Sequence, residues 1–185
     1  MSYTQLLFHA TAREKVLDGA TALVDAIRVT LGPRSKSVLI QKKWGTPIVC
    51  DDGVTIAKEI ELKDPEENLG AQMLRQAAEK TGDAVGDGTS TATLLAHSIF
   101  SDGDWNVVAG ASGIDIKRGL KRGPKIAIEE LNRTEDNVKT HKEQAQVETL
   151  AAHNDSNIGD RCADAMDTIA DHSVLIVQET RTQQT

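Results

Sequence analysis

Large aromatic side chains are scarce in this chain, and this scarcity limits the kind of core it can build. Only five of the 185 residues are aromatic, whereas 21 are alanine. Alanine is the strongest helix former, and small side chains let helices pack closely. The composition therefore predicts a mainly α fold with a few short β-strands. Because burying an alanine removes little apolar surface from water, we also expect the fold to depend on contacts with partner subunits.

Charge and residue usage argue against several classes of function. The 28 acidic residues outnumber the 21 basic ones, for a net charge of −7, which disfavours a broad nucleic-acid surface. No apolar run approaches the roughly 20 residues that span a bilayer, and no signal peptide is visible. Cys50 and Cys162 form no C-x-x-C pair, and the five histidines share no common spacing. We therefore expect no nucleic-acid or membrane partner, no zinc site and no Ser-His-Asp arrangement.

Apolar periodicity and turn residues predict the order of the elements. Thr11 should cap the first helix, with Glu14 completing a capping box. The expected elements are a helix over 12–31, hairpin strands over 37–41 and 47–50, a strand or short helix over 54–60, a helix from Asp64-Pro65 to Asp87-Gly88, a helix over 89–100 ending before Gly103, a helix over 114–131 kinked near Gly123-Pro124, helices over 141–153 and 156–170, and a strand over 174–177. The polar stretch 132–146 predicts a domain boundary.

The sharpest candidate for chemistry is the segment from Gly86 to Thr91, which lies between two expected helices. Gly88 lets a ligand approach the backbone, and the first N–H groups of the following helix form an anion site. Thr89, Ser90 and Thr91 add hydroxyl donors, and Asp87 offers a hard oxygen ligand to Mg²⁺. The segment could hold a metal-bound polyphosphate, although it lacks the P-loop pattern. The alternative is an ordinary helix–helix turn capped by Thr89.

Two further turns could flank a nucleotide. The first is Thr30-Leu31-Gly32-Pro33, which ends the first expected helix and leaves carbonyls and a hydroxyl exposed. The second contains Asp52, whose carboxylate could orient water or a metal. Each turn also fits a plain structural reading, the first as a helix stop and the second as a hairpin turn.

A series of short motifs connects these turns into one pattern. In chain order they are Val29-Thr30-Leu31-Gly32-Pro33, Asp52-Gly53-Val54, Glu61, Gly70-Ala71-Gln72-Met73, Gly86-Asp87-Gly88-Thr89, Thr91-Ala92-Thr93, Lys117-Arg118-Gly119, Ala145-Gln146-Val147 and Ala165-Met166-Asp167. In this order and spacing they resemble the group I chaperonin family, the GroEL type. The resemblance runs from about residue 8 to residue 178 without obvious gaps.

The resemblance implies an ATP-dependent chaperone whose subunits form seven-membered rings and act with a co-chaperonin on unfolded polypeptides. Residues 1–133 resemble the first segment of the equatorial ATP-binding domain, and residues 134–185 the first segment of the intermediate domain. By the same resemblance, Thr30 to Pro33 contact the nucleotide, Asp87 binds Mg²⁺, and Gly88 to Thr91 cradle the phosphates. Asp52 resembles the carboxylate that positions the attacking water.

Several positions depart from the family's pattern. Asp51 stands where lysine is usual, and an acid near phosphates should weaken ATP binding. Ser90 in place of threonine, Gly113 in place of proline, Glu148 in place of glycine and Pro124 within a helix are milder changes. The apical domain and the second equatorial and intermediate segments are not in this sequence. We therefore expect a fragment or truncated copy that alone has little or no ATPase activity.

Two other functions stay open. A half-domain with unpaired strands and alanine-rich faces could associate with intact chaperonin subunits without catalysis. A phosphotransferase would explain Asp87-Gly88-Thr89 but none of the other motifs. Because the motifs begin at about Phe8, no room is left for a transit peptide, which favours a bacterial cytoplasm.

Overall fold

The computed structural model of the chain describes residues 9–32, 34–42, 45–152, 154–169 and 175–176. It divides into two compact units, residues 1–122 and residues 123–185. The elements in chain order are α1 (His9–Arg28), β1 (Val38–Ile40), β2 (Ile48–Cys50), α2 (Gly53–Glu59), α3 (Pro65–Val85), α4 (Thr89–Val108), α5 (Gly113–Thr134), α6 (His141–Ala151) and α7 (Ser156–Thr168).

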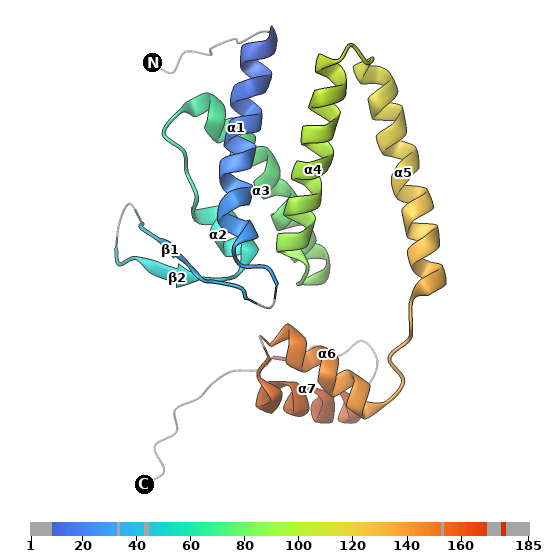
Figure 1. Ribbon diagram of the computed structural model, residues 1–185. Coiled ribbons are helices and arrows are strands. Elements are labelled where there is room, and N and C mark those ends of the chain that lie inside the picture. Colours follow the sequence, from blue (N-terminus) through green and yellow to red (C-terminus); the bar gives the residue numbers. More distant parts are fainter. Residues whose placement is uncertain (1–8, 33, 43–44, 153, 170–174, 177–185) are drawn as a thin grey trace. The chain divides into compact units, whose positions relative to one another are not determined.

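The fold is mainly α with one small sheet, as the composition predicts. β1 and β2 form the expected hairpin, an antiparallel pair in which Leu39 lies opposite Val49 (Figure 1). The segment after Asp52, which the sequence left open between strand and helix, is the short helix α2. Asp52 begins it as the N-cap, because its side chain accepts a hydrogen bond from the Thr55 N–H.

Helices α1, α3 and α4 pack against one another in the first unit, and glycines allow the closest approach. At Gly19 of α1, a β-carbon would stand only 2.7 Å from the Cα of Glu67 on α3. At Gly70 of α3, a β-carbon would stand 2.8 Å from the carbonyl carbon of Val16 on α1. Real β-carbons do not come this close to backbone atoms, so these two helices can meet only where glycine stands.

The core of the first unit is built from aliphatic side chains, as the scarcity of aromatic residues predicts. Leu23, Val24 and Ile27 of α1 and Ile56 of α2 are completely buried. Ala20, Ile40, Ala57, Ala71, Leu74 and Ala78 complete this core. Burying each large aliphatic side chain stabilises the fold by about 1.5–3 kcal/mol, and each alanine contributes less.

A charged cluster joins the start of α3 to α1. Asp64 caps α3 by accepting hydrogen bonds from the backbone N–H groups of Glu66 and Glu67, and Pro65 is the first helical residue. Lys15 of α1 donates to the carboxylates of Asp64 (2.6 Å) and Glu66 (2.8 Å). These hydrogen bonds hold the pKa of Lys15 above its usual range. The proline-led, acidic helix start predicted here is confirmed.

Three predicted helix boundaries are wrong. α1 begins at His9, so Thr11 lies inside its first turn and is not the N-cap. At its other end, α1 stops at Arg28, after which the Thr30 N–H turns back to the Ile27 carbonyl. α4 does not stop before Gly103 but continues to Val108. One glycine costs a helix only about 1 kcal/mol, which is too little to end a helix that gains backbone bonds beyond it.

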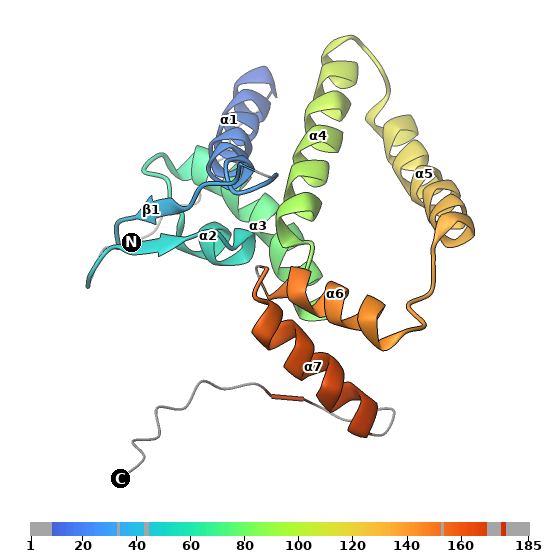
Figure 2. The same cartoon turned by 60° about the horizontal axis from the view of Figure 1, so that its bottom comes forward.

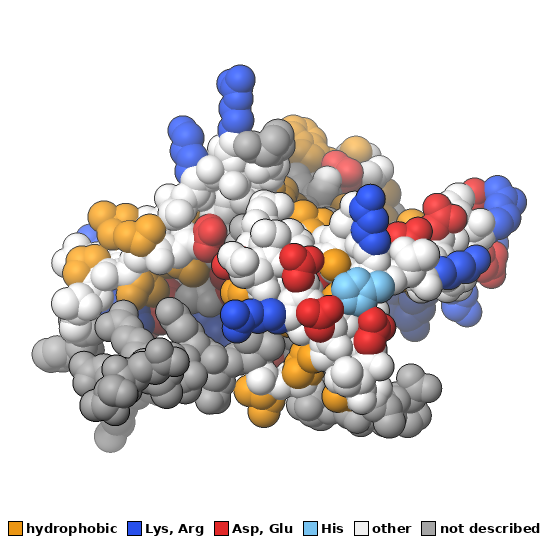
Figure 3. Space-filling model, turned by 90° about the horizontal axis from the view of Figure 1, so that it is seen from below, with side chains coloured by type: hydrophobic (Ala, Val, Ile, Leu, Met, Phe, Trp, Pro, Cys, Tyr) orange, Lys and Arg blue, Asp and Glu red, His pale blue; other side chains and the backbone are white. Residues whose placement is uncertain are grey.

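α5 runs from Gly113 to Thr134 with Pro124 inside it. The division between the two units falls within this helix, between Arg122 and Gly123. None of its residues is buried. The exposed apolar residues of α5 are Ile114, Leu120, Ile126, Ile128 and Leu131. The space-filling view of one face shows apolar side chains lying in the surface beside charged ones (Figure 3).

The second unit contains the paired helices α6 and α7 (Figure 2). A capping box starts α6: the Thr140 hydroxyl accepts from the Glu143 N–H, and the Glu143 carboxylate accepts from the Thr140 N–H. At Gly159 of α7, a β-carbon would stand 2.6 Å from the Thr149 nitrogen of α6. Both predicted helices are thus confirmed, over 141–151 and 156–168.

The apolar run predicted as a strand over 174–177 is only partly described. Val174 and Val177 lie outside the described residues, and Leu175 and Ile176 belong to no strand.

Candidate functional site

The turn between α3 and α4 leaves the start of α4 uncapped. Gly86 and Gly88 both have a positive φ, of 75° and 74°, which is the left-handed conformation that glycine adopts most readily. Gly88 is the N-cap of α4, and no side chain makes a capping hydrogen bond to that helix. The first N–H groups of a helix have no acceptor within it, so those of Thr89, Ser90 and Thr91 are available to an anion.

The alternative reading of this turn, in which Thr89 caps the helix, is wrong. Thr89 is the first helical residue and is buried. Its carbonyl accepts a 2.7 Å hydrogen bond from the hydroxyl of Thr93, which is also buried. The hydroxyls nearer to solvent are those of Ser90, which is half-buried, and Thr91, which is exposed. Because the Ser90 Oγ lies against Gly53, Thr91 carries the more exposed of these two hydroxyls.

Asp87 lies between the two glycines and is exposed. Its Oδ1 accepts a 2.6 Å hydrogen bond from the Gly88 N–H, which orients the carboxylate at the edge of the turn. Within the described part of the chain, no group of three or more histidine, cysteine, aspartate or glutamate side chains could hold a metal ion. A metal at Asp87 would therefore take most of its ligands from water and from a bound phosphate, as Mg²⁺ usually does.

The start of α2 lies directly against the start of α4. A β-carbon at Gly53 would stand 3.1 Å from the Cα and 3.1 Å from the Cβ of Ser90. This contact brings Asp52, the residue before Gly53, next to the uncapped turn, although the two segments are more than 30 residues apart in the sequence. The segments that carry the predicted water-positioning carboxylate and the predicted phosphate cradle therefore lie side by side.

Asp52 is held in place by a threonine that the sequence reading missed. Its Oδ2 accepts hydrogen bonds from the Thr55 N–H (2.9 Å) and the Thr55 hydroxyl (2.6 Å). In the described residues no hydrogen bond engages Oδ1. One carboxylate oxygen is thus used to start α2, and the other can bind water or a ligand. Asp52 followed three residues later by Thr55 is a helix-start signal that could have revealed this arrangement.

The turn after α1 is described up to Gly32, and Pro33 lies outside the described residues. The Thr30 hydroxyl donates to the Ile27 carbonyl (2.8 Å), and Gly32 has a positive φ of 89°. Among the described residues, no hydrogen bond or ion pair joins Thr30, Leu31 or Gly32 to Asp52 or to the α4 turn. The structure thus brings together the Asp52 and Asp87–Thr91 candidates, but shows no such link for Thr30 to Gly32.

Over the described ranges, no helix has both the length and the apolar character needed to cross a membrane.

This chain is similar to known chaperonins both in sequence and in fold. It is 62% identical over all 185 residues to Chaperonin GroEL 5 of Bradyrhizobium diazoefficiens, and covers 34% of that protein. The chain thus spans about a third of the length of this curated relative. A solved group III chaperonin in the open state has the same fold, with a TM-score of 0.71 at 23% identity, over 85% of this chain and 32% of that chain.

The sequence profile of the TCP-1/cpn60 chaperonin family matches residues 23–184, which is most of the chain. Together with the 62% identity to a chaperonin, this match shows that the chain belongs to the TCP-1/cpn60 chaperonin family.

Proposed function

We propose that this chain supplies the nucleotide-binding part of an ATP-dependent chaperonin that assists protein folding. Residues 1–133 belong to its equatorial domain and residues 134–185 to its intermediate domain. The observation that supports this proposal most is the contact between Gly53 and Ser90, because it sets a carboxylate beside an uncapped helix start. Helix N-termini favour phosphates, and a neighbouring carboxylate can orient water or a metal.

Each residue of the site has a distinct role in this proposal. The N–H groups at the start of α4 and the hydroxyls of Ser90 and Thr91 bind the phosphates of ATP. Asp87 ligates Mg²⁺, which neutralises phosphate charge when it is bound. Asp52 uses its Oδ1 to orient the attacking water, while Oδ2 holds the start of α2. Thr30, Leu31, Gly32 and Pro33 contact the remainder of the nucleotide.

ATP hydrolysis by these 185 residues alone should be slow. Asp51 adds an exposed acidic residue next to Asp52, and like charges repel the phosphates of a nucleotide. A full chaperonin cycle is also an activity of the whole protein, and this chain covers only about a third of its curated relative. The proposal is therefore tested by nucleotide binding to this chain and not by turnover.

Isothermal titration of the chain with ADP and Mg²⁺ tests the proposal. Asp87→Asn removes a metal-ligating charge and should weaken binding about tenfold or more, since bonds to charged groups are among the strongest. Asp83→Asn is the matched control, because Asp83 is an exposed aspartate near the end of α3, four residues before Asp87. It should bind like the unchanged chain.

The same titration can contradict the proposal. Binding that is unaffected by EDTA, or that Asp87→Asn and Asp83→Asn weaken equally, would exclude a magnesium site at Asp87. No binding at millimolar ADP by a chain that circular dichroism shows to be helical would exclude a formed nucleotide site.

A second candidate function is association with other chaperonin subunits. The exposed apolar residues of α5 favour it, because a surface helix that buries nothing gains by covering such residues. In the group I chaperonins that the motifs resemble, this association forms heptameric rings, which act with a co-chaperonin on unfolded polypeptides, and we expect such rings in the bacterial cytoplasm. The chain itself should therefore self-associate or bind intact subunits.

Sedimentation velocity over a range of concentrations tests association. Leu120→Gln with Leu131→Gln changes two apolar residues about three helical turns apart on one face of α5, and should reduce the associated fraction. Arg122→Gln with Lys125→Gln is the control on the opposite face, and should not. A chain that is monomeric at every concentration would contradict this candidate function.

A further inference from the structure

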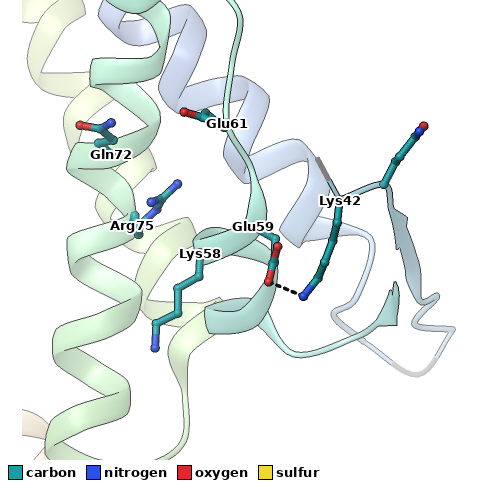
Figure 4. Close-up of a pocket in the computed structure, with 7 residues that line it drawn as sticks. Lys42, Lys58, Glu59, Glu61, Gln72 and Arg75 are labelled. Carbon is teal, nitrogen blue, oxygen red and sulfur yellow. Dashed lines mark ion pairs between the residues drawn. The ribbon is translucent and has the colours of Figure 1, made fainter. Parts of the chain in front are cut away.

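A polar pocket lies in the first unit, between α3 and the segments that follow β1 and α2 (Figure 4). Its volume is about 420 Å³, and every described side chain that lines it is charged or an amide. Lys42 follows β1, Lys58 and Glu59 end α2, and Gln72 and Arg75 come from α3. None of these residues belongs to the proposed nucleotide site.

The charges around this pocket do not balance. Glu59 is paired with Lys42 at 3.0 Å, and Glu61 also has an interaction partner. Lys58 and Arg75 have no ion pair within the described ranges of the chain. Arg75 donates from one terminal nitrogen to the Ile60 carbonyl (2.6 Å), while its Nε is shielded from solvent and lacks a hydrogen-bond acceptor. The described lining therefore holds three cations and two carboxylates, an excess of one positive charge, and Lys58 and Arg75 are its cations without an ion pair there.

We propose that this pocket binds a phosphate group, with Arg75 and Lys58 as its cationic ligands. The planar guanidinium of arginine suits the oxygens of a phosphate, and the lysine ammonium adds a second charge. A bound phosphate would offset the net positive charge of the lining. Among the described residues, the lining offers no apolar or aromatic side chain for a nucleobase, so we take the ligand to be free phosphate or a small phosphate ester.

Titration of the chain with inorganic phosphate at low ionic strength tests the proposal. We expect saturable binding of one phosphate, which Arg75→Gln and Lys58→Gln each weaken about tenfold or more. Arg75→Lys keeps the positive charge but lacks the planar guanidinium. Its affinity for phosphate should lie between that of the unchanged chain and that of Arg75→Gln. Lys80→Gln is the matched control, because Lys80 is an exposed cation on α3 that does not line the pocket. It should leave the affinity unchanged.

Two further ligands separate the possible sources of the phosphate group. Glycerol phosphate that binds at least as tightly as inorganic phosphate would identify the ligand as a phosphate ester, and weaker binding would identify it as free phosphate. Succinate, a dicarboxylate, should bind less well than either. If succinate binds most tightly, the phosphate proposal is wrong.

Other outcomes would also overturn the proposal, and they are distinct from failure of the nucleotide site. Phosphate binding that is lost in Asp87→Asn, or on adding saturating ADP and Mg²⁺, but is kept in Lys58→Gln, would place the phosphate at the start of α4 instead. Absence of saturable binding would overturn it as well. If Arg75→Gln unfolds the chain, Lys58→Gln decides the matter, because Lys58 is exposed.

Discussion

Gly53 packs directly against Ser90, and this contact joins two helix starts that are distant in the sequence. A β-carbon at residue 53 would stand 3.1 Å from the Cα of Ser90. The pair therefore determines how closely the Asp52 carboxylate approaches the uncapped first turn of α4. A side chain at position 53 would therefore have to displace Ser90.

Gly53→Ala should therefore destabilise the first unit and disturb the proposed site together. Overpacking of this kind costs about 1–3 kcal/mol, because the added methyl would displace the Ser90 Oγ and press on the Cα and Cβ of Ser90. We expect a lower midpoint in thermal unfolding, followed by circular dichroism, and weaker binding of ADP with Mg²⁺.

Gly82→Ala is the matched control for that experiment. Its β-carbon would meet the Thr89 methyl at 3.5 Å, an ordinary contact, and alanine favours the interior of α3. It should be neutral or stabilise by up to about 1 kcal/mol. If Gly53→Ala is as stable as Gly82→Ala, the two helix starts are not in the contact described.

Substitutions at Asp52 should separate its capping role from its charge. Asparagine is about as good an N-cap as aspartate, so Asp52→Asn should keep the free energy of unfolding, measured with urea, within about 0.5 kcal/mol. Asp52→Ala loses the acceptor for both Thr55 hydrogen bonds and should cost about 1 kcal/mol. Equal destabilisation by the two variants would show that Asp52 does not act as a cap.

His97 should make the stability depend on pH. Its Nε2 lies 2.9 Å from the Thr21 hydroxyl of α1. Partial burial and the nearby Arg28 hold the pKa of His97 below its usual value of 6.5, while Asp25 acts in the opposite direction. As the pH falls below 6.5, the unfolded chain takes up a proton at this histidine before the folded chain does. The free energy of unfolding should therefore decrease in that range, and the loss should level off below the folded pKa.

Urea unfolding between pH 5 and pH 8 checks this dependence. His97→Gln keeps a donor towards Thr21 but cannot titrate, so its stability should fall less on acidification than that of the unchanged chain. Ser98→Ala, at the neighbouring exposed position, should keep the original pH dependence. An unchanged pH profile in His97→Gln would rule out this role for His97.

The close approach of α1 and α3 gives a further test. Gly19→Ala would place a methyl against the Glu67 backbone and should cost about 1–3 kcal/mol or more in thermal unfolding. Gly119→Ala in α5 has open space around the new methyl and should stabilise by about 0.5–1 kcal/mol. A Gly19→Ala variant that is not destabilised would show that these helices are farther apart than described.

Local signals predicted the helices well where the chain carries explicit start and stop residues. The Asp64-Pro65 start and the glycine turn before Thr89 are both present as expected. Gly103 misled the prediction, because a glycine in a helix is a small penalty that neighbouring residues can overcome. Thr11 misled it as well, because a capping pattern is also compatible with a helix that begins one turn earlier.

Only part of the site could be predicted from the sequence. The Gly86–Thr91 segment carries its own signal, since glycines before a helix indicate an anion site. The contact of Gly53 with Ser90 depends on tertiary packing, which a local sequence pattern does not report. The Asp52-Gly53 turn left open a ligand-orienting carboxylate and a plain hairpin turn, and the two bonds from Thr55 show that Asp52 caps α2.

The most direct test of the account is an NMR titration of the ¹⁵N-labelled chain with ADP and Mg²⁺. If the start of α4 holds the phosphates, the largest amide shifts should fall on Gly88, Thr89, Ser90 and Thr91, and Asp87→Asn should abolish them at the same ligand concentration. Saturable binding with the largest shifts elsewhere, and none at these four amides, would contradict the proposed nucleotide site.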